Sequence, residues 1–176
     1  MAKKIWSFDS SFAGGDDKDR RLQLADALEC ADRDPTDADA WNNLGYLYAS
    51  YNRDDDAIAA YARGLQLDPG NDVIRYNLLV MLVVGKRYSE ALAIRCKSTD
   101  EDLQLTALFA FQHGTCYLAL DRPSEAVSLF ERALVHLPDH VPCIVNLYRA
   151  RLKVGDTNGA QDLSRRYPKV NFNGTA

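Results

Sequence analysis

The chain has 176 residues, a formal net charge of −4 and a hydrophobic fraction of 47%, which are values typical of a soluble globular protein. Its Lys and Arg residues are scattered and form no basic stripe, so we expect no nucleic-acid partner. The longest apolar run, Leu78 to Val84, is too short to span a bilayer, and no apolar run follows the N-terminal lysines as it would in a signal peptide. These features predict a cytoplasmic protein without membrane insertion.

The four cysteines are widely spaced and form no CxxC pair; they are Cys30, Cys96, Cys116 and Cys143. In a protein without a secretory signal, such spacing favours reduced, buried thiols over disulfides.

Residues 1–17 are predicted to be a flexible N-terminal tail, with a Gly14–Gly15 hinge and a group of large apolar residues. These residues are Ile5, Trp6, Phe8 and Phe12. Apolar residues then recur at helical spacing over 18–33, and Asp34–Pro35 ends the segment. We therefore predict a lone helix over 18–33.

Residues 38–71 place large and small side chains at offsets that suit two antiparallel helices. The set is Trp41, Leu44, Gly45 and Tyr48 on the first helix, and Ala57, Tyr61, Gly64 and Pro69 on and after the second. Gly45 and Ala57 allow the two backbones to approach closely, and Pro69 cannot continue the second helix.

The same offsets recur 69 residues later, where Gly114 is followed by Ala126, Phe130, Ala133 and Pro138. This separation is about twice a period of 34 residues, so one weaker copy lies between the two. Another copy follows them. The sequence predicts four repeats at 38–71, 72–106, 107–140 and 141–166, with a C-terminal tail at 167–176.

This pattern resembles the tetratricopeptide repeat (TPR) family. The resemblance implies an all-α fold: a right-handed superhelix of antiparallel helix pairs, preceded here by one capping helix. It also implies a concave groove lined by the first helix of each repeat. Such repeats bind other proteins, so we expect a non-catalytic interaction module with no cofactor.

The second repeat departs most from the pattern. Arg75 stands in the Trp place, Leu79 in the Gly place and Arg95 in the place of the second aromatic residue. Thr99–Asp102 reads as a capping sequence that starts the next helix early. We predict a short second helix at about 87–97 and a long helix at about 100–119, from simple drift or from a local opening that shapes a partner site.

Two groups of histidines are candidates for special roles. His113 replaces the usual Leu of the third repeat, and we interpret it as a hydrogen-bonded core residue. His136, His140 and Cys143 are close in sequence and suggest zinc. However, Pro138 separates the two histidines, so we predict no metal site.

The groove of this family offers two known binding modes to compare. A carboxylate clamp requires cations beside Asn on the inner helices, and the corresponding places here lack them. An asparagine ladder requires an amide just before the Leu place of each repeat. This chain has Asn43, Asn77, Gln112 and Asn146 there. Such amides both donate to and accept from a peptide backbone; alternatively, they cap or bridge neighbouring helices.

The remaining predicted peptide-binding residues share the inner face with these amides: Tyr46, Tyr76, Val80, Phe111 and Arg149. We hypothesise that this face binds an extended or helical peptide with apolar anchors, as an adaptor or assembly scaffold would. The alternatives are a chaperone for an apolar client segment, such as a secretion chaperone, and a homo-oligomer formed through the N-terminal tail. An enzyme is the least favoured reading, because the inner face offers few titratable groups.

Overall fold

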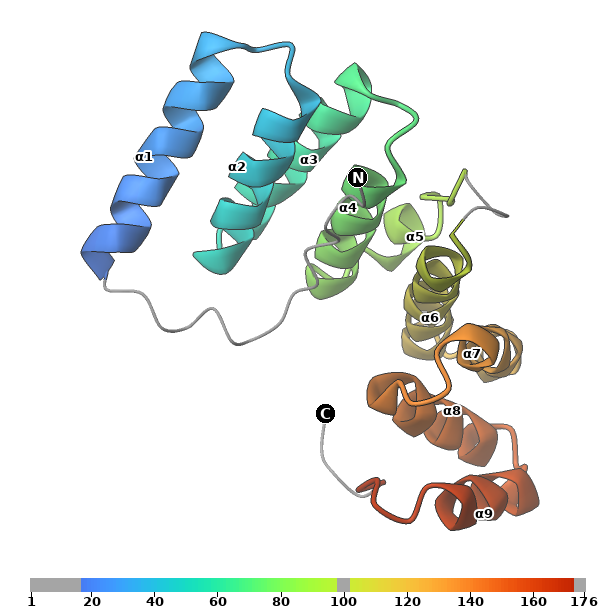
Figure 1. Cartoon of the computed structure of the whole chain (residues 1–176). Helices are drawn as coiled ribbons and strands as arrows, with labels where there is room; N and C mark the ends of the chain where they lie inside the picture. The colour runs from blue at the N-terminus through green and yellow to red at the C-terminus, as the bar shows by residue number, and fades with distance from the viewer. Residues whose placement is uncertain (1–16, 98–101, 173–176) are drawn as a thin grey trace. The chain divides into compact units, whose positions relative to one another are not determined.

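A computed structural model describes residues 17–97 and 102–172, and in these ranges the chain forms nine α-helices and no strand (Figure 1). The predicted all-α class is therefore confirmed. The predicted N-terminal tail lies outside the described residues up to residue 16, and α1 (Asp17–Arg33) follows it where a lone helix was expected. None of the helices in the described part of the chain has the length and apolar character that crossing a membrane requires.

The helices after α1 form four successive pairs, each with a short turn between its members. The pairs are α2 (Ala38–Ser50) with α3 (Asp54–Leu67), α4 (Asp72–Val84) with α5 (Tyr88–Ala91), α6 (Leu103–Ala119) with α7 (Pro123–His136), and α8 (Val141–Lys153) with α9 (Thr157–Arg166).

The chain divides into two compact units, one ending at Met81 and the other beginning at Leu82. In the first unit α2 packs between α1 and α3, and one buried cluster there consists of Ala31, Leu44 and Ala60. In the second unit α6, α7, α8 and α9 pack each against the next, around a core that includes Phe130, Cys143 and Leu147.

A glycine beneath an aromatic ring explains the offsets of the two strongest repeats. A Cβ atom added to Gly45 would lie 2.8 Å from the Tyr61 ring, and one added to Gly114 would lie 2.6 Å from Cε1 of Phe130. Both distances are too short for any side chain. The rings themselves are buried, with 3% and 0% of their residues' surface exposed. Each glycine therefore gives its neighbouring ring a place in the core.

A buried alanine recurs in all four repeats. It stands twelve residues after the position that Gly45 has in the first repeat, called here the Gly place. It is at most 1% exposed in every copy; the four are Ala57, Ala91, Ala126 and Ala160. A buried methyl group at this position in all four repeats indicates that the weak second and fourth repeats keep the register of the pattern.

The turns within the pairs also repeat. Each contains one residue with positive φ, seven places after the Gly place: Asn52 (57°), Lys86 (58°), Asp121 (55°) and Gly155 (82°). In the first three repeats an Arg follows this residue and pairs with an acid three residues later. These pairs are Arg53–Asp56, Arg87–Glu90 and Arg122–Glu125, at 2.7, 2.6 and 2.6 Å. The turn geometry thus repeats with the helices.

The second repeat has a shorter second helix than predicted. The expected range of 87–97 is wrong, because α5 ends at Ala91 and the residues after it up to Lys97 are not helical. The early start of the next helix is confirmed. Asp102 accepts a hydrogen bond from the Leu105 N–H at 2.9 Å, and α6 runs for 17 residues where α2, α4 and α8 have 13.

Part of the segment predicted as a C-terminal tail packs against the helices. The Tyr167 hydroxyl donates to the Pro138 carbonyl at 3.1 Å, and the ring centroids of Phe172 and Tyr148 lie 4.6 Å apart. Residues 173–176 of the predicted tail lie outside the described part.

Candidate functional site

The predicted ladder amides lie on the first helices of the repeats, and amide bridges between helices occur in the described residues of both units. In the first unit the Asn77 side chain on α4 donates through Nδ2 to Oδ1 of Asn42 on α2, at 2.9 Å. Both residues are 9% exposed. The bridge therefore joins the first helices of two successive repeats at a nearly buried position.

This amide pair has hydrogen-bonding capacity left over. An Asn side chain has two N–H donors and one carbonyl acceptor. The bridge uses Nδ2 of Asn77 and Oδ1 of Asn42. Among the described residues, the other two atoms, Oδ1 of Asn77 and Nδ2 of Asn42, make no hydrogen bond. The pair thus keeps an unused amide oxygen on Asn77 and an unused amide nitrogen on Asn42, in residues that are 9% exposed.

The second unit holds a similar but looser bridge. Nδ2 of Asn146 on α8 donates to Oγ1 of Thr115 on α6, at 3.4 Å. The Thr115 hydroxyl in turn donates to the Phe111 carbonyl one turn earlier, at 3.0 Å. In both units an amide of the ladder place thus reaches back to the first helix of the preceding repeat, which is the bridging role considered as an alternative above.

The other two ladder residues lie differently. Asn43 is exposed on α2, and its neighbour Asn42 takes the position beside Asn77. Gln112 is half-buried on α6. Sequence reasoning missed Asn42 as a partner, although the Asn42–Asn43 doublet was a signal: two adjacent amides on one helix cannot share a face, and only burial shows which one turns inward.

The remaining predicted residues range from half-buried to buried. Tyr76 is 9% exposed on α4, whereas Tyr46, Val80 and Arg149 are half-buried. Phe111 on α6 is also half-buried. Its ring centroid lies 6.1 Å from that of Phe130 and 4.6 Å, edge to face, from that of His140. Phe111 thus contributes to the packing between helices as well as to the surface.

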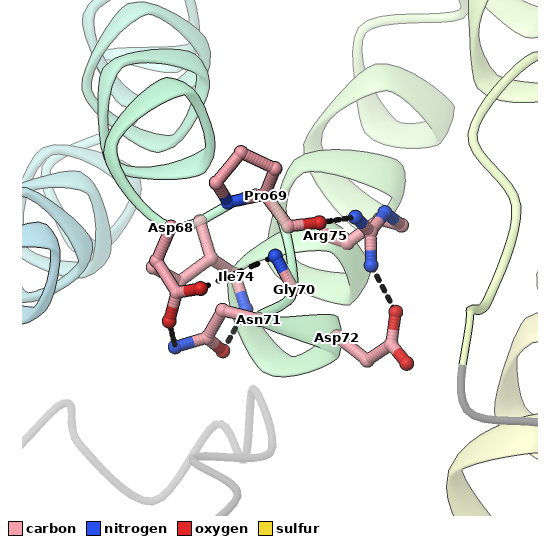
Figure 2. A network of polar contacts seen from close by, with 7 residues as sticks. All are labelled: Asp68, Pro69, Gly70, Asn71, Asp72, Ile74 and Arg75. Carbon is pink, nitrogen blue, oxygen red and sulfur yellow. Dashed lines mark hydrogen bonds and ion pairs between the residues drawn. The ribbon is translucent and has the colours of Figure 1, made fainter.

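Arg75, which replaces the Trp of the repeat, is held in a buried network at the start of α4. Figure 2 shows its guanidinium directed at the Asp72 carboxylate and at the Pro69 carbonyl. The side chains of Arg75 and Asp72 are 7% and 6% exposed. A buried charge requires a partner, and Arg75 has two, so we assign it a structural role in this turn.

The same network caps α4. Asn71 accepts a hydrogen bond from the Ile74 N–H at 3.2 Å and donates to Asp68 at 3.2 Å. Asp68 also accepts from the Gly70 N–H at 3.2 Å (Figure 2). The turn between α3 and α4 is therefore fixed by its own side chains.

His113 is a buried, hydrogen-bonded core residue, as predicted. Its Nε2 lies 2.8 Å from the Ile94 carbonyl, so this nitrogen carries the proton and donates. Burial lowers the pKa of His113, so the imidazole is neutral at physiological pH.

His140, one of the residues that suggested zinc, caps the start of α8. Nδ1 of His140 accepts a hydrogen bond from the Cys143 N–H at 3.2 Å, and burial lowers the pKa of this imidazole. The Cys143 thiol is fully buried, lies 3.5 Å from the Phe130 carbonyl, and has its pKa raised by burial to about 12. Within the described ranges no three His, Cys, Asp or Glu residues are placed to hold a metal ion.

Comparison with known proteins defines the class of this chain. Residues 38–71 match the family model of the tetratricopeptide repeat. The fold is similar to the crystal structure of MamA, with a TM-score of 0.71, 15% identity and 90% of each chain covered. It is also similar to YrrB, described as a TPR protein with an unusual peptide-binding site; the TM-score is 0.72, the identity 18%, and the match covers 89% of this chain and 80% of YrrB.

Among characterised sequences, a peroxisomal targeting signal receptor of Candida glabrata is 40% identical over 81 residues. The match covers 46% of this chain but only 13% of the receptor, so the chain spans a small part of that relative's length. Together with the repeated offsets, these likenesses support the assignment of the repeats of this chain to the tetratricopeptide-repeat family. Its repeats indicate a role in protein–protein interaction, and such repeats are typically non-catalytic.

Proposed function

We propose that the chain is a non-catalytic adaptor or scaffold that binds a peptide segment of a partner protein along the first helices of its repeats. The observation that carries this proposal is the Asn42–Asn77 pair, whose own hydrogen bond leaves the amide nitrogen of Asn42 and the amide oxygen of Asn77 unused.

An extended peptide presents an N–H and a C=O at each residue, and both need partners when they leave water. The Asn42–Asn77 pair matches one such peptide unit, with Nδ2 toward the carbonyl and Oδ1 toward the N–H. Because the two amides already hold each other, little side-chain entropy is lost when a ligand binds. The pair is therefore a preorganised receptor for backbone rather than for a particular side chain.

The neighbouring residues supply apolar contact. Tyr46, Tyr76 and Val80 belong to the same first helices, and their partly exposed surface suits apolar anchors of a peptide. In the second unit, Asn146 and Gln112 provide the amides, and Phe111 and Arg149 the flanking contacts. Asn43 completes the proposed set as an exposed amide beside the pair.

The comparisons support peptide recognition in general terms. One relative is a receptor for a targeting signal, and one structural neighbour has a peptide-binding site. A receptor for a signal binds a segment of another chain, which is the mode proposed here. A cytoplasmic location is part of the proposal.

The test is capture of a partner from a lysate of the source organism, with the full chain as bait. The double variant Asn42→Ala with Asn77→Ala removes both halves of the bridge, so neither amide is left with an unpaired neighbour. We expect it to lose the captured partner while circular dichroism shows unchanged helicity. Asn158→Ala, at an exposed asparagine on α9, is the matched control and should retain the partner. Unchanged capture by the double variant would sink the proposal.

Two single variants sharpen the site. Asn146→Ala asks whether the second unit contributes, and Asn43→Ala asks whether the exposed amide does. Loss of capture with Asn43→Ala alone would move the contact from the buried pair to the exposed residue.

A further inference from the structure

The two units of the chain have opposite charge. Residues 1–81 contain nine Lys and Arg against fifteen Asp and Glu, whereas residues 82–176 contain twelve against ten. The excess of cations lies at the end of the chain, where residues 141–176 hold six Lys and Arg and two Asp and Glu. Such asymmetry within one chain indicates partners of different charge for its two ends.

On α8 two of these cations lie on the face that carries the ladder amide. Asn146, Arg149 and Lys153 follow each other at helical spacings of three and four, so they form one stripe along the helix. The other first helices, α2, α4 and α6, have no cation at the equivalent positions. In place of Arg149 they carry Tyr46, Val80 and Thr115. In place of Lys153 they carry Ser50, Val84 and Ala119. The described first helices thus have cations at these two places in the last repeat alone.

Exposed aliphatic residues flank, along the chain, the ion pair at the end of this stripe. Lys153 pairs with Asp121, in the turn after α6, at 2.7 Å. Three chain neighbours of this pair are 40%, 45% and 41% exposed: Leu120, Leu152 and Val154. Exposed aliphatic surface near exposed cations offers a partner segment both apolar and charged contacts.

We infer that this edge of the second unit binds an acidic segment of a partner protein, whose aliphatic side chains lie on Leu120, Leu152 and Val154 and whose side-chain carboxylates meet Arg149 and Lys153. The inference rests on the proposed function, because it gives the chemistry of the segment that the second unit binds. Charge complementarity selects the acidic partner over a neutral one.

The present contacts of the two cations are compatible with this occupant. The side chains of Lys153 and Asp121 are 51% and 84% exposed, and an exposed pair contributes little, so a partner carboxylate exchanges with Asp121 at small cost. The Arg149 guanidinium has five donors in a planar fork, which leaves room for a carboxylate beside its existing contact.

The probe is a short synthetic peptide of Leu and Glu, amidated at its C-terminus, with leucines at every third or fourth place. We expect the full chain to bind it in a fluorescence anisotropy titration at low ionic strength, and a tenfold increase in salt to weaken binding about tenfold. A Leu and Lys peptide and a Ser and Glu peptide should each bind at least about tenfold more weakly. Equal binding of the Lys peptide would overturn the inference.

Paired variants locate the site. Arg149→Glu and Arg165→Glu change the net charge equally, but Arg165 lies on α9 and is 75% exposed beside Asp162. Likewise Leu152→Ser is matched by Val135→Ser, at a residue that is 71% exposed on α7. We expect the first member of each pair to weaken binding about tenfold and the second less than about threefold. Equal losses within a pair would show that only net charge or net hydrophobicity matters, and would overturn the site.

Further arms separate other occupants. Clearly tighter binding of a peptide with a free C-terminal carboxylate would replace side-chain recognition with end recognition. Salt-dependent self-association that Arg149→Glu abolishes would assign the edge to the acidic unit of a second copy. Partner capture that needs Asn42 and Asn77, together with no binding of the acidic peptide, would refute this inference while the proposed function stands.

Discussion

The third and second repeats follow one another in the chain but build their second helices differently. α7 has 14 residues and α5 has four. In the third repeat the Phe130 ring lies over Gly114, with no room for a Cβ between them. In the second repeat the place of the glycine holds Leu79, which is fully buried, and the place of the ring holds Arg95, which is exposed beyond the end of α5. A bulky residue at the glycine place thus accompanies the loss of the ring and of most of the second helix.

A shortened helix leaves backbone carbonyls without their usual partners. After α5 the Ile94 carbonyl receives its hydrogen bond from His113, which stands where the third repeat would otherwise have Leu. Two departures from the repeat pattern, one in each repeat, are therefore parts of one arrangement. The comparison shows that a departure from the repeat sequence in the second repeat, which leaves the Ile94 carbonyl outside a helix, is compensated by a polar residue of the third repeat, His113.

The largest expected effect comes from removing the ring that the second repeat lacks. Phe130→Ala should lower the free energy of unfolding by about 3–5 kcal/mol, because it empties a fully buried site between α6 and α7. Arg95→Ala, at the same place of the second repeat, should change it by less than about 0.5 kcal/mol, because the side chain is exposed. Chemical denaturation followed by far-ultraviolet circular dichroism measures both. Comparable losses would show that the two places are equivalent after all.

Substitution of Gly114, the glycine beneath the Phe130 ring, should also destabilise the chain strongly. Gly114→Ala places a Cβ 2.6 Å from Phe130, and we expect a loss of about 1–3 kcal/mol even though alanine favours the helix. Phe130→Leu in the same chain removes the flat ring and should recover part of this loss, which a double-mutant cycle measures. A stabilising Gly114→Ala variant would mean that the glycine is not needed for close approach.

Much of this fold follows from the sequence, because its signals are local and repeated. Gly45 with Tyr61 and Gly114 with Phe130 predict both the helical pairs and their register, and the structure bears out the offsets. The length of α5 could not be predicted in the same way. Residues 92–97 keep helix-compatible amino acids, yet after α5 the Ile94 carbonyl pairs with His113 on α6 instead of continuing the helix. No local propensity predicts such a contact.

The candidate site was predicted less completely. Spacing identifies the place of the ladder amides, but it does not show that Asn77 turns to Asn42 rather than Asn43. That choice depends on the packing of two helices 35 residues apart in sequence, and one residue of rotation moves an amide from the inside to the outside. The pairing of residues that are far apart in sequence therefore cannot be predicted from spacing alone.

The hydrogen bond between the second and third repeats should make stability depend on pH. Burial lowers the pKa of His113, nearby Arg95 and Arg132 lower it further, and the carbonyls of Ile94 and Ala91 act in the opposite direction. The folded chain therefore binds this proton less readily than the unfolded chain does. The contribution of neutral His113 to the free energy of unfolding is complete above the ordinary pKa of 6.5. It is lost as the pH falls below 6.5 toward the lower pKa of His113 in the folded chain.

His113→Leu tests this dependence. It restores the usual residue of the repeat but leaves the Ile94 carbonyl without its donor, so we expect a loss of about 1 kcal/mol at pH 7.5. It should also flatten the fall in unfolding free energy between pH 7 and 5.5. A slope remains from His140, whose pKa is lowered in the same direction. An unchanged slope would show that His113 does not titrate differently in the folded and unfolded chains.

The smallest effect concerns the turn that the second repeat shares with the others. Lys86 has a φ of 58°, in the left-handed region, where Asn52 and Asp121 are better tolerated and Gly155 carries no penalty. Lys86→Gly should raise the free energy of unfolding by about 0.5–1 kcal/mol, since relief of the strained backbone exceeds the entropy that glycine costs. Gly155→Lys makes the reverse change in the fourth repeat and should lower it by a similar amount. If Lys86→Gly instead destabilises the chain, the side chain of Lys86 makes a contact in the folded state that outweighs its backbone strain.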